Sequence, residues 1–178
     1  MKAITGKAFS GKSYFANQLR DLGFKVLVGD EFYKSDYMAN QPSYNAIKSQ
    51  LGSEFVTETE VDRQKLRDWI LVDLNNLDKL SKVVHPFFYE HLKSNYYDFV
   101  EIADINNKNF NFFELFSNIY VLNVNDQQRQ KHIKNRNVNK SQIELFKAIN
   151  RASSSKNVVN ISYEERQNPE FLKQFLKK

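Results

Sequence analysis

The sequence contains no cysteine in its 178 residues. This absence excludes a disulfide framework, a zinc site built on thiolates and a catalytic thiol. Histidine is also scarce, and the spacing of His85, His91 and His132 matches no metal-ligand pattern. The sequence therefore supports neither a histidine metal centre nor a Ser-His-Asp hydrolase.

Glycine and proline are few, with five and three residues, and they form no linker. No internal repeat or low-complexity tract is visible either. Hydrophobic residues make up 41% of the chain and include 15 Phe, which is ample for a buried core. We therefore expect residues 1–178 to form one domain.

No apolar run approaches the ~20 residues that a membrane-spanning helix needs. The first residues, MKAITGKAFSGKS, turn glycine-rich before the apolar region of a signal peptide could develop. We expect no membrane association and a soluble, cytoplasmic protein.

The chain is moderately basic, with 26 Lys and Arg against 21 Asp and Glu and a net charge of +5. This balance suits an anionic partner such as a nucleotide, a phosphorylated metabolite or a nucleic acid, although solubility alone also explains it. Nucleic acid is the least favoured partner, because the charge is modest and the interleaved aromatic residues resemble a core. A small-molecule partner is expected.

Apolar segments with strand and helix periodicity alternate along the chain. Strands separated by helices favour an α/β fold with a parallel sheet. The middle of the chain, about 33–95, is mostly helical in pattern. The expected strands are 3–5, 25–28, 99–105, 118–124 and 158–161, and the clearest helices are 11–22, 62–80, 127–151 and 168–178.

Residues 6–13, GKAFSGKS, match the phosphate-binding pattern G-x-x-x-x-G-K-[ST] between an expected strand and helix. Gly6 and Gly11 let the backbone wrap closely around phosphate oxygens, and the following helix adds its positive N-terminus. Lys12 would reach the β- and γ-phosphates, and the Ser13 hydroxyl would bind Mg²⁺. The alternative is a glycine-rich turn that carries Lys-Ser by chance. The residues expected to surround ATP are Gly6, Ala8, Phe9, Ser10, Gly11, Lys12, Ser13 and Tyr14.

Asp30 closes the second expected strand, near the carboxyl edge where α/β proteins bind ligands. A carboxylate there would orient and deprotonate an attacking hydroxyl, or help to hold Mg²⁺. Its alternative role is to cap the next helix, and Glu31 is a competing candidate for the catalytic role.

A basic segment lies within residues 127–151. Arg129 and Arg136 are seven residues apart and share one helix face with Ile133 between them. Cations that close over a transferring phosphoryl group lower the barrier to transfer. A mobile basic lid and an ordinary solvated helix face are both consistent with this pattern.

Two further residues have both a functional and a structural interpretation. Pro86 disfavours helical geometry at His85, which would aim the His85 ring into a cleft, although a packed or capping histidine is the alternative. Asp62 resembles a helix N-cap, which leaves Arg63 available for an anion.

Taken together and in this order, these elements resemble the dephospho-CoA kinase family. The His-Pro and Asp-Arg-x-x-Leu pieces are more specific than the phosphate loop, and the resemblance spans nearly the whole chain. The matching pieces are T-G…G-K-S at 5–13, G-F-K-V-L-V-G-D at 23–30, V-D-R-Q-K-L at 61–66, V-V-H-P at 83–86, I-Y-V-L-N-V at 119–124 and the Gln/Arg-rich stretch ending at Arg136.

This resemblance implies a P-loop kinase fold with a five-stranded parallel sheet flanked by helices, a helical substrate-binding insertion at about 33–95 and a lid at about 127–151. It implies transfer of the γ-phosphate of ATP to the ribose 3′-hydroxyl of dephospho-CoA. Lys12 and Ser13 match the phosphate and Mg²⁺ groups. Asp30 matches the proposed general base, whose contribution is mainly orientation. Arg136 matches the lid arginine, and Arg63 and His85 fall at positions that serve the acceptor.

The chain also departs from the family pattern. Phe9 stands where the family's loop usually has a third glycine, Tyr14 stands where it has threonine, and the segment after Asp104 lacks the usual P-L-L-x-E. Two alternatives to a dephospho-CoA kinase follow. One is another P-loop kinase that acts on a nucleoside or nucleotide, and the other is a nucleotide-binding protein without transfer activity.

Overall fold

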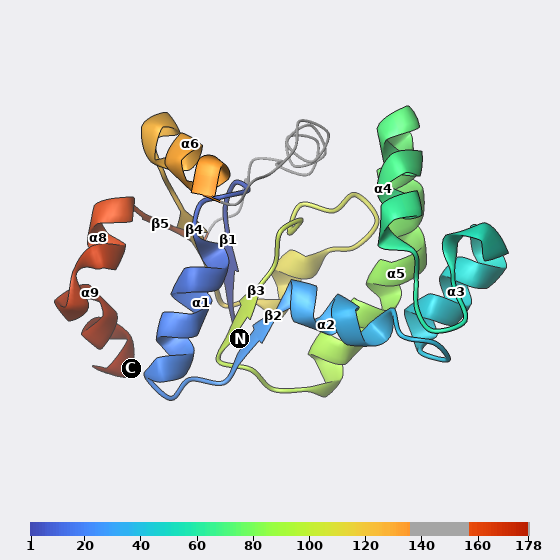
Figure 1. Cartoon of the computed structure of the whole chain (residues 1–178). Helices are drawn as coiled ribbons and strands as arrows, with labels where there is room; N and C mark the ends of the chain where they lie inside the picture. Colours follow the sequence, from blue (N-terminus) through green and yellow to red (C-terminus); the bar gives the residue numbers. More distant parts are fainter. Residues whose placement is uncertain (136–156, 178) are drawn as a thin grey trace. The chain divides into compact units, whose positions relative to one another are not determined.

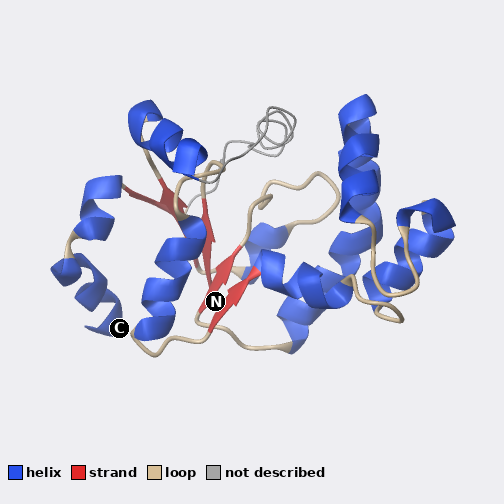
Figure 2. Cartoon of the chain, in the orientation of Figure 1, coloured by secondary structure: helices blue, strands red, loops and turns tan. Residues whose placement is uncertain are grey.

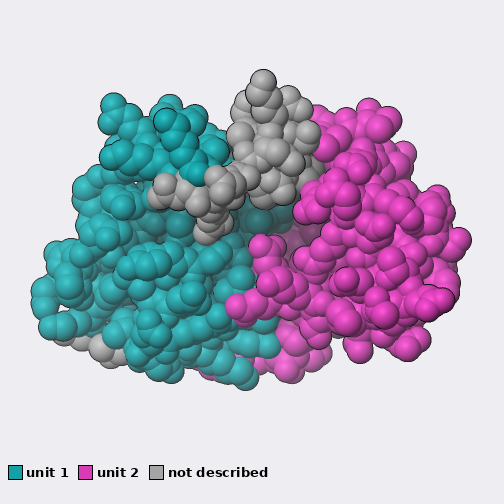
Figure 3. Space-filling model, in the orientation of Figure 1, with its two compact units in different colours: residues 1–28, 97–105, 113–178 teal, residues 29–96, 106–112 magenta. Residues whose placement is uncertain are grey.

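A computed structural model describes residues 1–135 and 157–177 of the chain. The chain divides into two compact units, which Figure 3 distinguishes by colour. Unit 1 comprises residues 1–28, 97–105 and 113–178, and unit 2 comprises residues 29–96 and 106–112. No helix of the described residues is both long and apolar enough to cross a membrane.

Unit 1 is built on a five-stranded sheet in the order β2-β3-β1-β4-β5, with every neighbouring pair parallel. β1 lies at the centre, and its Lys2 pairs with Phe99 on one side and Asn118 on the other. The predicted five-stranded parallel sheet is confirmed (Figure 1). The strands are β1 (Lys2–Thr5), β2 (Val26–Val28), β3 (Phe99–Glu101), β4 (Asn118–Leu122) and β5 (Val158–Ile161).

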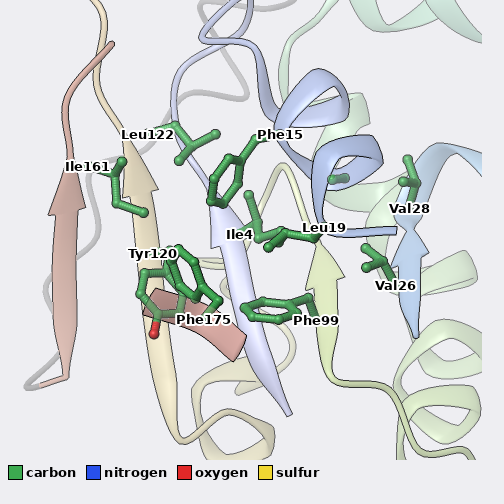
Figure 4. Packing of buried hydrophobic residues seen from close by; sticks show 11 residues of the cluster. Ile4, Phe15, Leu19, Val26, Val28, Phe99, Tyr120, Leu122, Ile161 and Phe175 are labelled. Carbon is green, nitrogen blue, oxygen red and sulfur yellow. The ribbon is translucent and has the colours of Figure 1, made fainter. Parts of the chain in front are cut away.

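The core of unit 1 forms where helix α1 (Lys12–Asp21) packs on the sheet. Phe15 and Leu19 of α1 are fully buried against the sheet, together with Phe99 of β3 (Figure 4). Phe175 of the C-terminal segment meets Phe15 edge-on at a ring-centroid distance of 6.0 Å. Full burial of each such side chain contributes about 1.5–3 kcal/mol. The helices described after β3 are η2 (Phe112–Leu115), α6 (Asp126–Asn135), α8 (Tyr163–Gln167), α9 (Pro169–Lys173) and η3 (Gln174–Lys177).

Helices are the regular elements described in unit 2 (Figure 2). Its core centres on Phe88, whose ring centroid lies 5.0 Å from that of Phe32, 5.5 Å from that of Tyr33 and 5.9 Å from that of Phe112. The elements are α2 (Gly29–Asp36), α3 (Pro42–Gln50), η1 (Ser53–Phe55), α4 (Arg63–Val72) and α5 (Asn75–Ser94).

The single helix predicted at 62–80 is wrong, because α4 and α5 are separate helices. Asp73 between them is extended, with φ −147° and ψ 113°. Its carboxylate accepts a hydrogen bond from the Asn75 backbone N–H at 2.9 Å. A short acidic side chain of this kind competes with the helix for backbone donors and ends it.

Several other predicted elements are shorter than expected, among them the strand at 118–124, which ends at Leu122. The strand at 99–105 ends at Glu101, which pairs with Val28, the last residue of its other partner β2. The C-terminal helix predicted at 168–178 is divided into α9 and η3, which follow the separate helix α8 in the sequence. Asn168 is extended before a proline and accepts from the Glu170 N–H at 3.0 Å, which starts α9 afresh.

The expectation that Pro86 holds His85 outside a helix is also wrong. Both residues lie within α5, which continues through the proline. The buried side chains of α5, including Val84, Phe88 and Leu92, stabilise the helix by more than the single backbone hydrogen bond that proline removes. Of the basic helix predicted at 127–151, α6 covers the first part; residues 136–151 lie outside the described residues.

Candidate functional site

The phosphate loop connects the carboxyl end of β1 to α1. Gly6 has φ 138° and Gly11 has φ 87°, a range that glycine adopts readily. A Cβ atom at Gly6 would lie 2.6 Å from the Leu122 carbonyl oxygen of β4, so no side chain fits there. The close passage of the loop over β4 therefore requires glycine at this position.

Helix α1 starts directly after this loop. Its N-cap residue is Gly11, so no side chain caps the first turn, and that turn contains no acidic residue. The first backbone amides of a helix and its dipole attract anions. The local structure thus favours a phosphate group at the N-terminus of α1.

Lys12 supplies the cation of the loop. Its Nζ donates to the Gly6 carbonyl at 3.0 Å and to the Lys7 carbonyl at 3.3 Å, so the ammonium group folds back over the loop. Ser13 is half-buried in the first turn of α1, and Tyr14 beside it is 58% exposed. The Ser10 hydroxyl is fully buried and has no hydrogen-bond partner among the described residues. Three features of the loop fit the phosphate chain of a nucleotide. They are the positive φ angles of Gly6 and Gly11, the uncapped start of α1 and the position of Lys12 over the loop.

A magnesium ion is compatible with this loop. The described residues contain no group of three or more acidic or histidine side chains that would hold a metal on their own. Mg²⁺ at nucleotide sites takes most of its ligands from phosphates and water, so one hydroxyl and one carboxylate suffice. Ser13 places a hydroxyl in the first turn of α1.

Glu101 is a carboxylate that our sequence analysis did not single out. It is 6% exposed, ends β3 and pairs in register with Ile4 of β1, one residue before Thr5. A buried carboxylate at the carboxyl end of the strand beside β1 suits a metal-bound phosphate. The signal in the sequence was the acidic residue within the apolar run FVEI.

Two backbone carbonyls of the loop are held by side chains from distant segments. The Nδ1 atom of His132 on α6 lies 2.8 Å from the Phe9 carbonyl oxygen, and because a carbonyl only accepts, Nδ1 is the donor. Arg166 of α8 donates to the next carbonyl, that of Ser10, at 2.6 Å. Neither residue was predicted from the sequence, because neither belongs to a local motif.

Unit 2 brings Asp30 and Arg63 to the surroundings of one buried tyrosine. Asp30 is exposed in the first turn of α2, two residues after the end of β2, and Arg63 begins α4. The Arg63 guanidinium lies 5.1 Å from the centre of the Tyr37 ring. Burial raises the pKa of Tyr37, Arg63 lowers it, and the carboxylates of Asp36 and Asp30 raise it. The two predicted acceptor residues therefore act on the same local electrostatic environment.

His85 and Arg136 complete the predicted set. The His85 ring is half-buried in α5, where its centroid lies 5.4 Å from that of Phe112 and 6.0 Å from that of Phe110. Arg136, the predicted lid arginine, lies outside the described residues.

The strand order of the sheet, with a glycine-containing phosphate loop between β1 and α1, is that of the P-loop kinase fold. Two solved structures share this fold. A protein of Thermus thermophilus is 21% identical with a TM-score of 0.70, and the match covers 99% of this chain and 93% of that one. The dephospho-CoA kinase of Campylobacter jejuni is 17% identical with a TM-score of 0.55, and the match covers 99% and 96%.

The family model for dephospho-CoA kinase matches residues 1–160, so the chain belongs to the dephospho-CoA kinase family. The dephospho-CoA kinase of Mycoplasma genitalium is 34% identical over 155 residues, which are 83% of this chain and 78% of that protein. That of Fusobacterium nucleatum is 29% identical over 106 residues, 57% of this chain and 54% of that protein. The resemblance inferred from the sequence is confirmed, and the chain is a kinase by family.

Proposed function

We propose that this chain transfers the γ-phosphoryl group of ATP to the ribose 3′-hydroxyl of dephospho-CoA, which yields coenzyme A and ADP. The observation that carries this proposal is the family match over residues 1–160, which includes a phosphate loop whose backbone and lysine fit a nucleotide. The two units provide candidate residues for a donor and an acceptor.

On the donor side, the loop amides and Lys12 bind the β- and γ-phosphates. The charge of the transferring group spreads over its oxygens, so a fixed ammonium group lowers the barrier. Ser13 and Glu101 are the protein oxygens that we propose for Mg²⁺, which neutralises charge between the phosphates when it is bound. Ala8, Phe9, Ser10 and Tyr14 complete the nucleotide surroundings.

On the acceptor side, Asp30 orients the 3′-hydroxyl. The oxygen of that hydroxyl forms a bond to the γ-phosphorus, while the bond from the γ-phosphorus to the bridging oxygen of ADP breaks. A carboxylate is a weak base, so it receives the proton late, as the phosphoryl group is transferred, and releases it to water. Arg63, His85 and Arg136 are proposed to bind the anionic acceptor and the transferring group.

The proposal also includes the domain organisation of the chain and the cellular location of the enzyme. We propose that residues of about 33–95 form the acceptor-binding insertion and that about 127–151 form the lid. We propose a cytoplasmic enzyme, because both substrates are charged, water-soluble nucleotides.

A coupled ADP-release assay with Mg-ATP tests the activity directly. Dephospho-CoA, adenosine, deoxynucleosides and nucleoside monophosphates are compared as acceptors, and the product is identified by mass spectrometry. We expect release with dephospho-CoA alone and a 3′-phosphorylated product. Release with another acceptor would replace the substrate, whereas ATP binding without release would leave a binding protein that lacks transfer activity.

A further inference from the structure

Arg166 is a buried charged residue that the proposed chemistry does not use. It lies in α8 and is 3% exposed. Burial lowers its pKa below the ordinary value for arginine, although a guanidinium stays protonated under all physiological conditions. A permanently charged group in a buried position requires compensating hydrogen bonds.

Backbone carbonyls from three separate segments provide those hydrogen bonds. One terminal nitrogen donates to Ser10 in the phosphate loop at 2.6 Å, and the other donates to Asn123, just after β4, at 2.8 Å. The Nε atom donates to Ser162, just after β5, at 3.1 Å. All three contacts lie within unit 1. The planar guanidinium therefore ties the phosphate loop to the carboxyl ends of β4 and β5.

The contact with Ser10 determines the orientation of a phosphate-binding amide. In a trans peptide the C=O of one residue and the N–H of the next point in opposite directions. When Arg166 holds the Ser10 carbonyl, the Gly11 N–H is turned to the side of the peptide that faces away from Arg166. Peptide planes beside a glycine rotate more freely than those beside other residues. The hydrogen bond from Arg166 therefore restrains the loop at its most flexible peptide.

The surroundings of Arg166 hold it in place for this role. Ser162 and Glu165 form a reciprocal capping box at the start of α8, with bonds of 3.2 Å and 2.7 Å. The Tyr163 ring lies 5.5 Å from the guanidinium carbon. Tyr163 also approaches His132, at 5.9 Å between ring centroids, and His132 holds the adjacent loop carbonyl of Phe9.

We propose that Arg166 is a positioning residue of the nucleotide site: it fixes the Ser10–Gly11 peptide so that the Gly11 N–H is aimed at a nucleotide phosphate. This inference rests on the proposed binding of ATP, and it assigns to α8 a role in catalysis without contact with the substrate. Loss of Arg166 therefore weakens the binding of ATP and ADP and leaves the affinity for the acceptor unchanged.

The test compares Arg166→Met and Arg166→Lys with Arg20→Met. Arg20 is a matched control, because its Nε and Nη2 atoms also donate to a backbone carbonyl, that of Val26, at 3.2 Å and 3.0 Å. The dissociation constants of ATP and ADP are measured by calorimetry without acceptor, and the KM values of ATP and dephospho-CoA are measured separately. An ATP-induced shift of the Gly11 amide resonance reports the peptide orientation.

We expect Arg166→Met to weaken ATP and ADP binding by about 10- to 100-fold, as for the loss of a charge-assisted hydrogen bond. Arg166→Lys, which keeps the charge but has no planar fork, should recover part of this loss and serves as the second variant if Arg166→Met does not fold. The acceptor KM should change by less than about twofold. Arg20→Met should reduce thermal stability without changing ATP affinity.

The proposal is overturned if the Arg166 variants lose stability as Arg20→Met does but bind ATP like the wild type. It is also overturned if the KM values of ATP and acceptor rise together. Wild-type protein that binds ATP without phosphorylating dephospho-CoA would contradict the proposed substrate and leave the positioning role intact. Wild-type protein that does not bind ATP would contradict both.

Discussion

Phe9 adopts a left-handed backbone conformation, with φ 65°, that residues with a Cβ atom disfavour. The family pattern described in the sequence analysis has glycine at this position, and a left-handed backbone suits glycine. The Phe9 side chain is 9% exposed, so its burial offsets the strain. Strain of about 1–2 kcal/mol is outweighed by the 3–5 kcal/mol that truncation of a buried phenylalanine typically costs.

We predict that Phe9→Gly and Phe9→Ala both destabilise the protein, but in an unusual order. Phe9→Ala loses the buried ring and keeps the strain, so the free energy of unfolding should fall by about 3–5 kcal/mol. Phe9→Gly relieves the strain and should be more stable than the alanine variant by about 1 kcal/mol. Urea denaturation followed by circular dichroism measures the difference. An alanine variant at least as stable as the glycine variant would show that the loop is not left-handed at this residue.

The effect of the negative charge of Asp30 can be separated experimentally from its effect on the orientation of the acceptor hydroxyl. Asp30→Asn should lower kcat by about 10²–10⁴-fold, because the amide cannot accept the proton of the acceptor hydroxyl, and should change the KM of ATP only slightly. Steady-state kinetics in both substrates measures the two effects. Glu31→Gln is the control, since it removes the same charge from the same exposed helical turn. A larger loss in the Glu31 variant, or lost ATP binding in a folded Asp30 variant, would contradict the assignment.

Among the described helices, α5 is the one with a proline in its interior, whereas the prolines of α3 and α9 stand at the first position. Its 20 residues continue past Pro86, whose missing N–H leaves the helix without the backbone bond to the residue four positions earlier. Val83, Val84 and Phe88 are buried on either side of it. The helix therefore persists because its buried face is anchored, not because its local sequence favours helix at every position.

Replacement of Pro86 by alanine should stabilise the protein. Alanine restores the missing hydrogen bond and the higher helix propensity, which the greater freedom of the unfolded chain partly cancels, so the free energy of unfolding should rise by about 1–2 kcal/mol. Chemical denaturation measures the change, with the exposed Lys82→Ala as a control expected to remain within about 0.5 kcal/mol. A destabilised Pro86 variant would show that packing in unit 2 depends on the proline ring itself.

At the scale of the whole molecule, the residues proposed for donor binding and for acceptor binding fall in different compact units. Unit 2 is inserted between β2 and β3, and residues 106–112 return to it after β3. The phosphate loop belongs to unit 1, whereas Asp30, Arg63 and His85 belong to unit 2. In the proposed function, donor binding and acceptor binding therefore depend on separately packed cores.

Hydrogen exchange should reveal this division. ATP at about 100 times its dissociation constant should slow exchange in the loop and in α1 by up to about 100-fold, because only the ligand-free form opens there. Dephospho-CoA should slow exchange chiefly in α2 and α4. Mass spectrometry of peptic peptides measures both patterns, with each ligand added alone. Equal protection of both units by ATP alone would contradict separate donor and acceptor units.

Local interactions account for what was predictable. The spacing of residues 6–13 identified the loop, because the whole phosphate-binding pattern lies in eight contiguous residues. The helix breaks at Asp73 and Asn168 were missed, since their polar side chains replace helical hydrogen bonds that the apolar periodicity suggests should continue. The helical state of His85 was missed for the opposite reason, because burial elsewhere along α5 overrides the local preference of the residue before proline.

By itself, the sequence determined the parallel α/β sheet, the phosphate loop with Lys12 and Ser13, and the kinase family, because periodicity and motif spacing are written in contiguous residues. Only the tertiary structure decided that Glu101 ends a strand beside β1 and that Arg166 holds the Ser10 carbonyl from 156 positions away. Such contacts form when parallel strands bring their carboxyl ends to one edge of the sheet. No local pattern encodes that meeting, since it depends on the strand order as a whole.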